Sequence, residues 1–444
     1  MVKEGYKEVK ALGEKYIIPE EWSLKELSEV LTVIRNGSSK KQNKQGKGLP
    51  VSRIETIADG TINYDKIGYV DLESEDLKKH KLEKGDILFS HINSIAHIGK
   101  VAQYKADKKL YHGMNLLKLR FDNEKVTDQF MLHRLKSVNA KHFYERYAKQ
   151  AVNQASLNQN DVGLYTFPLP PLPEQKKIAS ILSSVDRSIE KTDEVIEETK
   201  ELKKGLMQEL FTRGVSGNDL RLSPHENNDL YKNSYLGFVP EDWIDYQISD
   251  IAETDYGLNS AIDKTLSKGI KMISVGNVNK DGTLDFDDVN YAIEDKISSE
   301  DILLKGDILF NWRNGSKEHL GKTIYFDLND EFTHVGLLIR IRTNKNENIY
   351  SKFLYYFMRY IHFKQFFTRA KKQVNNTFNK TELNNLQVFI PPLEEQKKIA
   401  SILSSVDAKI QKEEEYKEKL EKLKKGLMQK ILTGEIRVNK DMEV

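Results

Sequence analysis

"EQKKIASILSSVD" occupies residues 174–186, and the same thirteen residues return at 395–407, an offset of 221 residues. A helix that is buried in two places would need its apolar residues twice. It would have no such need for Glu-Gln-Lys-Lys, because charged and amide side chains are seldom fully buried. We therefore expect the two strings to face the same kind of partner.

The same offset relates other parts of the chain, so the whole sequence repeats one large unit. The register slips by one residue in places, since His97–Lys100 and His319–Lys322 match with an offset of 222. The other matched pairs are PEEW at Pro19–Trp22 with PEDW at Pro240–Trp243, KGDILF at Lys84–Phe89 with Lys305–Phe310, and LKKGLMQ at Leu202–Gln208 with Leu423–Gln429. A period this long indicates a duplicated domain and not a solenoid.

The two copies have diverged unevenly. Residues 30–80 and 251–301 have little in common, whereas the strings that open the two helices are identical. A young duplication would leave both parts alike, so recent origin is the weaker explanation. We favour two helices that face one kind of partner and two globular parts that face different ligands.

Two long helices follow the globular parts. Pro173 and Glu174 suit a first helical turn, because proline lacks only a donor that is unused there and a carboxylate favours the positive end of the dipole. Apolar residues with coiled-coil spacing follow at Ile178, Leu182, Val185, Ile189, Val195, Leu202, Leu206 and Leu210, and at Ile399, Leu403, Val406, Ile410, Tyr416, Leu423, Leu427 and Ile431. This pattern predicts helices of about 40 residues and about 60 Å, with stops at Gly214 and Gly434. We expect an antiparallel pair, and a homodimeric coil is the alternative.

The globular halves are predicted to be mixed α/β. Strands are expected after turns in Glu83–Phe89, His112–Phe121, Leu304–Phe310 and His334–Arg342, and helices in Asp128–Tyr147 and Ile349–Phe367. The polar stretch Gly214–Ser234 has no periodicity, and we interpret it as the linker between the two copies.

Composition excludes several classes of protein. The net charge is +2, with 39% apolar and 31% charged residues, so any nucleic-acid contact must depend on local patches. Cysteine is absent, which excludes disulfides, thiol catalysis and cysteine-based zinc sites and fits a reducing cytoplasm. No run approaches the roughly 18 apolar residues of a membrane span, so we expect a cytoplasmic protein without a membrane segment.

Local charge points to nucleic acid. Val30–Ile54 and Asn348–Thr381 contain no acid and are rich in Asn, Gln, Ser and Thr, which bond phosphates and base edges. Their basic residues are Arg35, Lys40, Lys41, Lys44, Lys47 and Arg53, and Lys352, Arg359, Lys364, Arg369, Lys371, Lys372 and Lys380. A solvated basic surface would explain one such run, whereas two favour nucleic-acid contact.

Polar loops that differ between the copies are the expected recognition elements. GDILF continues as SHINS in the first copy and as NWRNGS in the second, and AVNQAS at Ala151–Ser156 faces QVNNTF at Gln373–Phe378. Simple turn capping is the alternative for any single residue. The candidate DNA-binding residues are Arg35, Asn36, Ser38, Ser39, Lys40, Lys41, Arg53, Ser90, His91, Asn93, Ser94, Lys100, Asn153, Gln154, Asn259, Asn277, Asn311, Trp312, Arg313, Asn314, Ser316, Lys322, Lys371, Lys372, Asn375 and Asn376.

Catalytic motifs are not found. Glu174–Lys176 and Glu395–Lys397 imitate the E-x-K of a nuclease, but they lie in a first helical turn with no strand before them, so we expect surface charge. The Asn/Asp-Pro-Pro-aromatic tetrad of amino-methyltransferases does not occur, and neither do a phosphate loop or paired histidines at metal-binding spacing. We expect no catalytic activity, no metal and no cofactor.

The repeated strings resemble the specificity subunit of type I restriction–modification enzymes over the full length of the chain. The strings that carry the resemblance are PPLPEQKKIASILSSVD, PPLEEQKKIASILSSVD, LKKGLMQELFTRG and LKKGLMQKILTGEIRV. The resemblance implies target recognition domains at 1–158 and 236–380, spacer helix regions at 159–213 and 381–444, and a linker at 214–235. Each domain would read one half of a split double-stranded DNA target.

The resemblance also implies partners. The antiparallel helices would space the domains and bind two methyltransferase subunits, which bind S-adenosylmethionine and flip and methylate adenine. Restriction subunits would attach through the methyltransferases. The candidate partner-binding residues are Glu174, Gln175, Lys176, Lys177, Glu395, Gln396, Lys397 and Lys398.

Two other functions are weaker interpretations. A fused methyltransferase–specificity protein is opposed by the missing tetrad. A coiled-coil scaffold that binds DNA without sequence preference would show a steep salt dependence and little discrimination.

Overall fold

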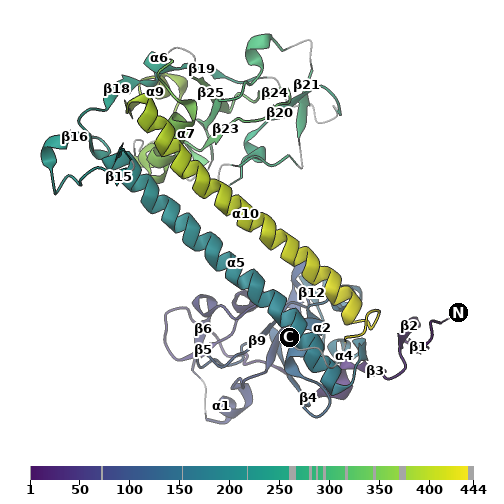
Figure 1. Cartoon of the computed structure of the whole chain (residues 1–444). Coiled ribbons are helices and arrows are strands. Elements are labelled where there is room, and N and C mark those ends of the chain that lie inside the picture. Colours follow the sequence, from purple (N-terminus) through teal and green to yellow (C-terminus); the bar gives the residue numbers. More distant parts are fainter. Residues whose placement is uncertain are drawn as a thin grey trace. The chain divides into compact units, whose positions relative to one another are not determined.

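The computed structural model describes residues 2–71, 74–152, 154–217, 219–259, 267–279, 283–286, 289–293, 297–315, 319–343, 347–369 and 377–438. The chain forms two compact units. Unit 1 consists of residues 1–194 and 415–444, and unit 2 consists of residues 195–414. Helices α5 (Leu172–Arg213, 42 residues) and α10 (Leu393–Ile431, 39 residues) each contribute to both units (Figure 1). The predicted mixed α/β fold with two long helices is confirmed.

Both units are built on a four-stranded antiparallel sheet with the same strand order. In unit 1 the order is β4 (Leu31–Asn36), β10 (Leu116–Phe121), β7 (Ile87–Ser90) and β9 (Val101–Gln103). In unit 2 it is β19 (Glu253–Tyr256), β25 (Leu338–Arg342), β22 (Ile308–Asn311) and β23 (Thr323–Tyr325). The predicted strands β7, β10, β22 and β25 are confirmed, and the shared order confirms the duplication.

Smaller elements surround each sheet. Those of unit 1 are β1 (Tyr6–Ala11), β2 (Glu14–Pro19), β3 (Ser23–Glu26), β5 (Leu49–Val51), β6 (Gly68–Val70), α1 (Ser74–His80), β8 (Ile92–Asn93), α2 (Asp128–Leu135), α3 (Val138–Tyr147), β11 (Lys149–Ala151), β12 (Gln154–Ser156), α4 (Gln159–Gly163) and β13 (Thr166–Leu169). Those of unit 2 are β14 (Val215–Ser216), β15 (Asp219–Leu220), β16 (Tyr231–Ser234), β17 (Gly237–Pro240), β18 (Ile244–Gln247), α6 (Ile248–Ile251), β20 (Ile270–Ile273), β21 (Asn290–Ala292), β24 (Phe332–His334), α7 (Ser351–Phe363), α8 (Phe366–Arg369), α9 (Lys380–Asn384) and β26 (Gln387–Ile390).

Each of the two shorter predicted helices is divided. The segment 128–147 breaks between α2 and α3, where the Ser137 hydroxyl accepts a hydrogen bond from the Ala140 N–H and caps α3. The segment 349–367 breaks between α7 and α8, where Gln365 adopts a φ of 58°. Serine favours a cap over a helix interior, which explains the first break.

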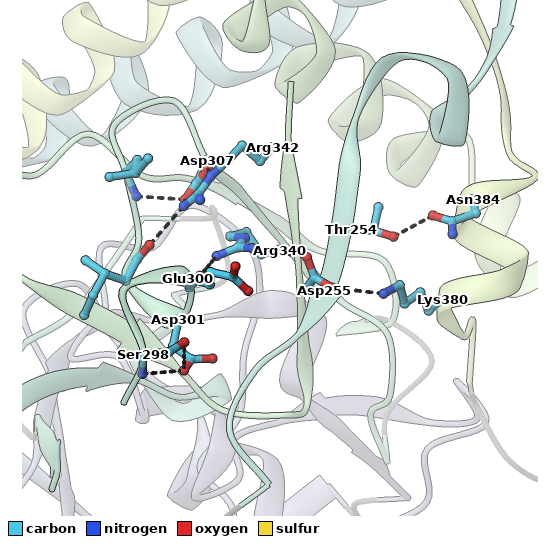
Figure 2. A network of polar contacts seen from close by, with 12 residues as sticks. Thr254, Asp255, Ser298, Glu300, Asp301, Asp307, Arg340, Arg342, Lys380 and Asn384 are labelled. Carbon is cyan, nitrogen blue, oxygen red and sulfur yellow. Dashed lines mark hydrogen bonds and ion pairs between the residues drawn. The ribbon is translucent and has the colours of Figure 1, made fainter. Parts of the chain in front are cut away.

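The repeated KGDILF string forms the same hydrogen-bonded turn in each unit. In unit 2 the Asp307 carboxylate accepts a hydrogen bond from the Leu304 N–H at 2.8 Å and two from Arg342, at 2.8 and 2.6 Å (Figure 2). In unit 1 Asp86 makes the same contacts with the Glu83 N–H and Arg120. The glycine before each aspartate has a positive φ, which glycine adopts at little cost. The string therefore closes the turn that leads into the central strand.

The main core of each unit combines the globular part with both long helices. In unit 1 the sheet, α2 and α3 pack with the first turns of α5 and with Ile431, Leu432 and Val438. In unit 2 the sheet and α7 pack with the first turns of α10 and with Met207 and Phe211 near the end of α5. Each globular part is thus completed by the end of the helix that begins in the other copy.

The two helices run antiparallel within each unit, as predicted. In unit 1 Lys424 pairs with Asp186 at 2.5 Å and Lys417 with Asp193 at 2.6 Å, so the residue numbers rise along one helix as they fall along the other. In unit 2 Lys203 pairs with Asp407, and Lys200 pairs with Glu414 at 2.9 Å.

The predicted seam is correct at the helix ends and wrong in the middle. Ile178, Leu182, Leu210, Ile399, Leu403, Ile410 and Ile431 are buried as expected. Near the middle of α5 the buried residues are Thr192, Ile196, Thr199 and Lys203, whereas Leu202 is 56% exposed. Tyr416 and Leu423 of α10 are also exposed. A search for apolar spacing misses a contact face that is built from threonine and ion-paired lysine.

The stretch interpreted as a linker contains regular structure that belongs to unit 2. It includes β14, β15 and β16, and Arg221 within it pairs with Asp242 and Glu395, each at 2.6 Å. Among the described residues, no helix has the length and hydropathy required to cross a bilayer.

Candidate nucleic-acid interface

Polar loops meet at one end of the sheet in unit 1. Strand β4 ends at Asn36 opposite Leu117, and β7 ends at Ser90 opposite Leu116. Both strand ends therefore flank the start of β10. Strand β8 then pairs with β12, which places Ala155, the neighbour of Gln154, opposite Asn93. The structure thus gathers residues from three separated segments that the sequence had singled out.

Unit 2 repeats this arrangement with different side chains. Strand β19 ends at Tyr256 opposite Ile339, and β22 ends at Asn311 opposite Leu338. Arg313 then bridges to Thr377 at the position that β8 and β12 occupy in unit 1.

A polar pocket of about 530 Å³ lies at this end of the sheet in unit 1. It is lined by Asn36, His91, Ile92, Lys149, Ser156, Leu157, Asn158, Gln159, Asn160 and Asp161. His91 is 7% exposed, and its Nδ1 has no hydrogen-bond partner among the described residues. Burial lowers the pKa of His91 to about 4, so its ring is neutral near pH 7. A neutral imidazole offers one donor and one acceptor.

Trp312 occupies the place of His91 in unit 2. Its indole Nε1 donates a hydrogen bond to the Gly336 carbonyl at 2.7 Å, and its ring meets that of Tyr256 edge-on at 5.2 Å. The neighbouring Arg313 is exposed. Tyr256, an exposed aromatic residue at the end of a strand, was not among the residues predicted to contact DNA. Its position just before a polar segment could have indicated such a role.

An ionic network supports these loops in unit 2 (Figure 2). The Asp255 carboxylate lies between the guanidinium of Arg340 at 3.1 Å and the ammonium of Lys380 at 3.0 Å. Thr254 donates a hydrogen bond to Asn384 at 2.6 Å. These contacts join β19 to β25 and α9, so the strand that leads into Tyr256 is held from both sides.

The candidate residues differ in exposure. Those with exposed side chains are Arg35, Asn36, Ser39, Lys41, Ser94, Gln154, Asn259 and Arg313. Those that are half-buried are Lys40, Arg53, Asn93, Lys100, Trp312, Asn314 and Lys322. Asn153, Ser316, Lys371, Lys372, Asn375 and Asn376 lie outside the described residues.

Five of the candidates are buried. His91 lines the pocket described above, whereas Ser38, Ser90, Asn277 and Asn311 are 5% exposed or less and do not support the prediction of direct contact. Asn277 holds its own turn, because its side chain accepts from the Ser274 N–H and hydroxyl and donates to the Asp285 carbonyl. The Ser90 hydroxyl accepts from Asn93 at 3.1 Å. Asparagine and serine were predicted to contact bases, but Ser90 and Asn277 instead form hydrogen bonds that hold the loops of their own unit.

Two of the basic residues in the run Val30–Ile54 form ion pairs with carboxylates that lie outside the run. Arg53 pairs with Glu55 at 3.1 Å, and Lys40 lies 3.6 Å from Asp76. Lys100 donates to the Ala58 carbonyl at 2.8 Å. The exposed cations at the sheet ends are therefore a smaller set than the sequence suggested.

The repeated Glu-Gln pair has internal partners, contrary to the prediction. Glu174 is fully buried and accepts hydrogen bonds from Trp22 Nε1 at 2.9 Å and from Arg437 at 2.7 and 2.9 Å. Gln175 accepts from the Thr127 N–H and donates to the carbonyls of Lys125 and Pro170. The expectation of surface charge at Glu174 is wrong.

Unit 2 repeats the arginine and glutamine contacts, whereas the Val215 N–H takes the part that the Trp22 indole has in unit 1. Glu395 accepts from the Val215 N–H at 2.8 Å and pairs with Arg221, and Gln396 bonds the backbone of Tyr350, Asn348 and Pro391. Burial raises the pKa of the Glu395 carboxyl, while the Val215 N–H and Arg221 act in the opposite direction. The identical residues therefore fix each helix start to its own unit.

The lysines that follow lie at or near the surface, where Lys397 pairs with Glu394 at 2.8 Å and Lys398 donates to the Gly217 carbonyl. Lys176 and Lys397 are exposed, and Lys177 and Lys398 are half-buried. Arg221 and Arg437 were not predicted from the sequence, although an arginine follows each helix-ending glycine within a few residues in both copies. Among the described residues, no cluster of histidine and carboxylate side chains is suited to a metal ion.

Comparisons with known proteins agree with this duplicated architecture. The family model described as the type I restriction modification DNA specificity domain matches the chain twice, over residues 19–201 and 240–422. The MjaX specificity subunit of Methanocaldococcus jannaschii, named as part of a type I restriction enzyme, is 36% identical over 440 residues and 95% of each chain. The MjaVIII specificity subunit of the same organism is 29% identical over 343 residues, which cover 74% of this chain and 75% of the relative.

A solved structure shows the same fold. The crystal structure of the type I restriction–modification S subunit from M. genitalium superposes with a TM-score of 0.56 at 17% identity, over 93% of this chain and 96% of that one. The family model covers most of the chain and matches it once in each copy of the repeat. The chain therefore belongs to the type I restriction–modification DNA specificity family, as a specificity subunit with two target recognition domains and a role in DNA recognition rather than catalysis.

Proposed function

We propose that each recognition domain reads one half of a bipartite, asymmetric DNA target. The observation that carries this proposal is the equivalent sheet end in the two units, where the loops have the same positions and different side chains. His91 and Ile92 in unit 1 correspond to Trp312 and Arg313 in unit 2. Two domains that share a backbone arrangement but carry different side chains are suited to two different half-sites.

The exposed side chains have two different roles in recognition, namely phosphate binding and contact with base edges. Arg35 at the end of β4 and Lys41 in the following loop bind phosphates, because exposed cations give affinity without reading sequence. Asn93 and Ser94 in unit 1 and Arg313 and Asn314 in unit 2 read base edges. Arginine suits guanine, and amide side chains suit adenine.

The helices space the two readers and bind two methyltransferase subunits, through which restriction subunits join the complex. The methyltransferases bind S-adenosylmethionine and transfer the methyl group to adenine. The names of the relatives, which are subunits of type I restriction enzymes, support this assembly. A cytoplasmic location belongs to the same proposal and is supported by the absence of cysteine.

Reconstitution tests the proposal. The purified chain alone should neither methylate nor cleave DNA, and addition of its methyltransferase partner and S-adenosylmethionine should give adenine methylation at one bipartite sequence. Sequencing of methylated bases in a host that carries the system should show the same sequence. Methyl transfer by the chain alone would contradict the proposal. Binding that is steeply salt-dependent and equal on all sequences would instead identify a nonspecific scaffold.

A further inference from the structure

The tetrapeptide Arg-Asn-Gly-Ser occurs twice in the chain, at Arg35–Ser38 and at Arg313–Ser316, and it contains both of the Asn-Gly pairs in the sequence. The two positions are not equivalent in the repeat. The first lies at the end of the edge strand β4, and the second follows the inner strand β22. Both lie at the candidate DNA-reading end of a sheet, so each unit carries one Asn-Gly pair there.

An Asn-Gly pair is a site of spontaneous deamidation, because glycine has no Cβ atom to hinder its backbone nitrogen. That nitrogen attacks Cγ of the asparagine and forms a five-membered imide, and ammonia leaves with the proton that the nitrogen gives up. Water then opens the imide at one of its two carbonyls, which yields aspartate or isoaspartate. The net change replaces an amide by a carboxylate, and water is the only co-reactant.

The first Asn-Gly pair is held by tight backbone contacts. Asn36 is the last residue of β4, and its backbone is paired with β10. A Cβ atom built on Gly37 would lie 2.0 Å from the Gly113 carbonyl oxygen, so this glycine is packed against backbone. The Ser38 N–H donates to the His112 carbonyl at 2.9 Å. The attack on Cγ requires the backbone between Asn36 and Gly37 to rotate, and these contacts oppose that rotation.

The second Asn-Gly pair has open space beside it. Strand β22 ends at Asn311, and Arg313 then bridges to Thr377. Asn314 is half-buried and Gly315 is exposed. A Cβ atom built on Gly315 meets nothing within 4 Å, and this glycine has no positive φ. The surroundings of Gly315 therefore differ from those of Gly37, although the two tetrapeptides are identical.

We propose that Asn314 is a site of spontaneous deamidation whose conversion ends recognition of one DNA half-site, whereas Asn36 is protected by its strand. The effect on recognition rests on the proposed function, in which Asn314 reads a base edge beside Arg313. An amide both donates and accepts hydrogen bonds, but a carboxylate only accepts them. The product also places a negative charge where the DNA backbone approaches, and this charge weakens binding.

Unit 1 lacks this liability at the corresponding loop position. There Asn93 is followed by Ser94, and the side chain of a serine hinders attack by its own nitrogen. The Asn93 amide also donates to the Ser90 hydroxyl at 3.1 Å. The two recognition domains should therefore change at different rates as the protein ages, and unit 2 should lose its selectivity first.

Peptide mapping by mass spectrometry tests the chemistry on the full chain. After incubation in warm, mildly alkaline buffer, Asn314 should convert at least about tenfold faster than Asn36, which corresponds to about 1.4 kcal/mol in activation free energy. In concentrated urea the two residues should convert at similar rates, because the tetrapeptides are identical. Equal rates in the folded chain, or no conversion of Asn314, would overturn the proposal.

Gly315→Ala is the matched variant, because alanine fits at this position and leaves Asn314 in place. Its added methyl group should slow the conversion of Asn314 to about the rate seen at Asn36. Asn314→Asp reproduces one product of the reaction from the start. The melting temperature of each variant should stay close to that of the wild-type chain, since the substitutions lie at an open loop.

Recognition is measured with the methyltransferase partner, S-adenosylmethionine and a random DNA library. Fresh wild-type and fresh Gly315→Ala protein should methylate one bipartite sequence. Incubated wild-type protein and fresh Asn314→Asp protein should lose selectivity in the half-site of unit 2 by about tenfold or more, and should keep it in the other half-site. Incubated Gly315→Ala protein should keep both half-sites.

The failures of the two proposals are distinguishable. A fresh wild-type complex without sequence preference would overturn the proposed function, and the relative rates at Asn314 and Asn36 would still decide the chemical step. If Asn314 converts first but the incubated wild-type complex reads both half-sites unchanged, the effect on recognition is overturned together with the role of Asn314 in reading bases.

Discussion

Glu174 lies inside unit 1 with Trp22 and Arg437 as its partners, and this placement changes the meaning of the repeated string. Polar residues that recur in two copies need not face an external partner, because a buried carboxylate with a specific set of donors is constrained as tightly as an apolar residue. The sequence could not reveal this role, since Arg437 is 263 residues away. Only the fold brings the two side chains together.

Removal of that arginine should destabilise unit 1. Arg437→Ala leaves the fully buried Glu174 without its cation, and breaking a buried pair from one side costs several kcal/mol. Because Arg437 is partly exposed, we expect the free energy of unfolding of unit 1 to fall by about 2 kcal/mol. Urea unfolding followed by tryptophan fluorescence measures this change. Glu21→Ala, which removes the exposed partner of the same arginine, should cost well under half as much.

Alanine substitutions in the recognition loops should separate the two half-sites. Alanine at Asn93 and Ser94 should relax one half of the methylated sequence, and alanine at Arg313 and Asn314 should relax the other half. Each lost base contact corresponds to about 1–3 kcal/mol of discrimination. Sequencing of methylated sites in a random DNA library measures the effect. If both sets of substitutions changed the same bases, the two-reader proposal would fail.

Buried neutral histidines should make unit 1 sensitive to acid. Burial lowers the pKa of His112 to about 3 and the pKa values of His91 and His133 to about 4, below the value of about 6.5 in an unfolded chain. Their contribution to stability is therefore complete above pH 6.5 and is lost as the pH falls towards the folded-state values. Each histidine can contribute up to about 1.4 kcal/mol per pH unit in that window.

His112→Gln provides the measurement for the acid effect. A glutamine amide can donate to the Leu116 carbonyl, which His112 Nε2 contacts at 3.0 Å, but it cannot bind a proton. Urea unfolding between pH 7 and pH 4.5 should therefore show a shallower loss of stability for the variant. An unchanged pH dependence would show that His112 does not titrate in this way.

Among the elements, those with a strong local signal were predicted well. The long helices, their stops and the strands after the GD turns follow from periodicity, proline and glycine. The middle of the helix pair was misread, because its contact face uses Thr192, Thr199 and Lys203 and not the neighbouring Leu202. The candidate recognition loops were singled out by their position after strands and remain a prediction, and the division into buried and exposed amides depends on the packing of the sheet end.

Substitution of Asp307, in the turn before β22, should destabilise unit 2 as much as substitution of a core residue. Asp307 is 1% exposed and satisfies both the Leu304 N–H and Arg342 (Figure 2). Asp307→Ala should lower the free energy of unfolding of unit 2 by about 3 kcal/mol, because it leaves the half-buried Arg342 guanidinium without its carboxylate and the Leu304 N–H without its acceptor. Asp86→Ala should have the same effect on unit 1. Hydrogen exchange resolved by unit would measure both, and a small equal effect on both units would contradict this role.

For the whole molecule, the helices as spacers make a geometric prediction. The chain passes between its units near Glu194 and Glu415 in the two helices. Seven residues inserted at both places would keep the coiled-coil phase and add about 10 Å, or about three base pairs. The preferred DNA spacer should lengthen while both half-site sequences stay the same. Affinity should fall, because the added pairs rotate one half-site around the duplex.

Methylation of a library with varied spacer lengths measures the expected change. A one-helix insertion is the control, because it breaks the match between the paired helices and should reduce activity at every spacer. An active double-insertion variant that keeps the original spacer would show that the helices do not set the separation.

The shared core of unit 1 determines the order in which the chain can fold during synthesis. Unit 2 is one continuous segment, whereas unit 1 needs Ile431, Leu432 and Val438 to complete its core. At about 5–20 residues per second, residues 1–194 wait roughly tens of seconds on the ribosome for those residues. During this time the surface around Trp22 and Ile178 stays uncovered. The recognition domain that is translated first is therefore the one that matures last, and it is the half of the molecule that depends most on protection by chaperones.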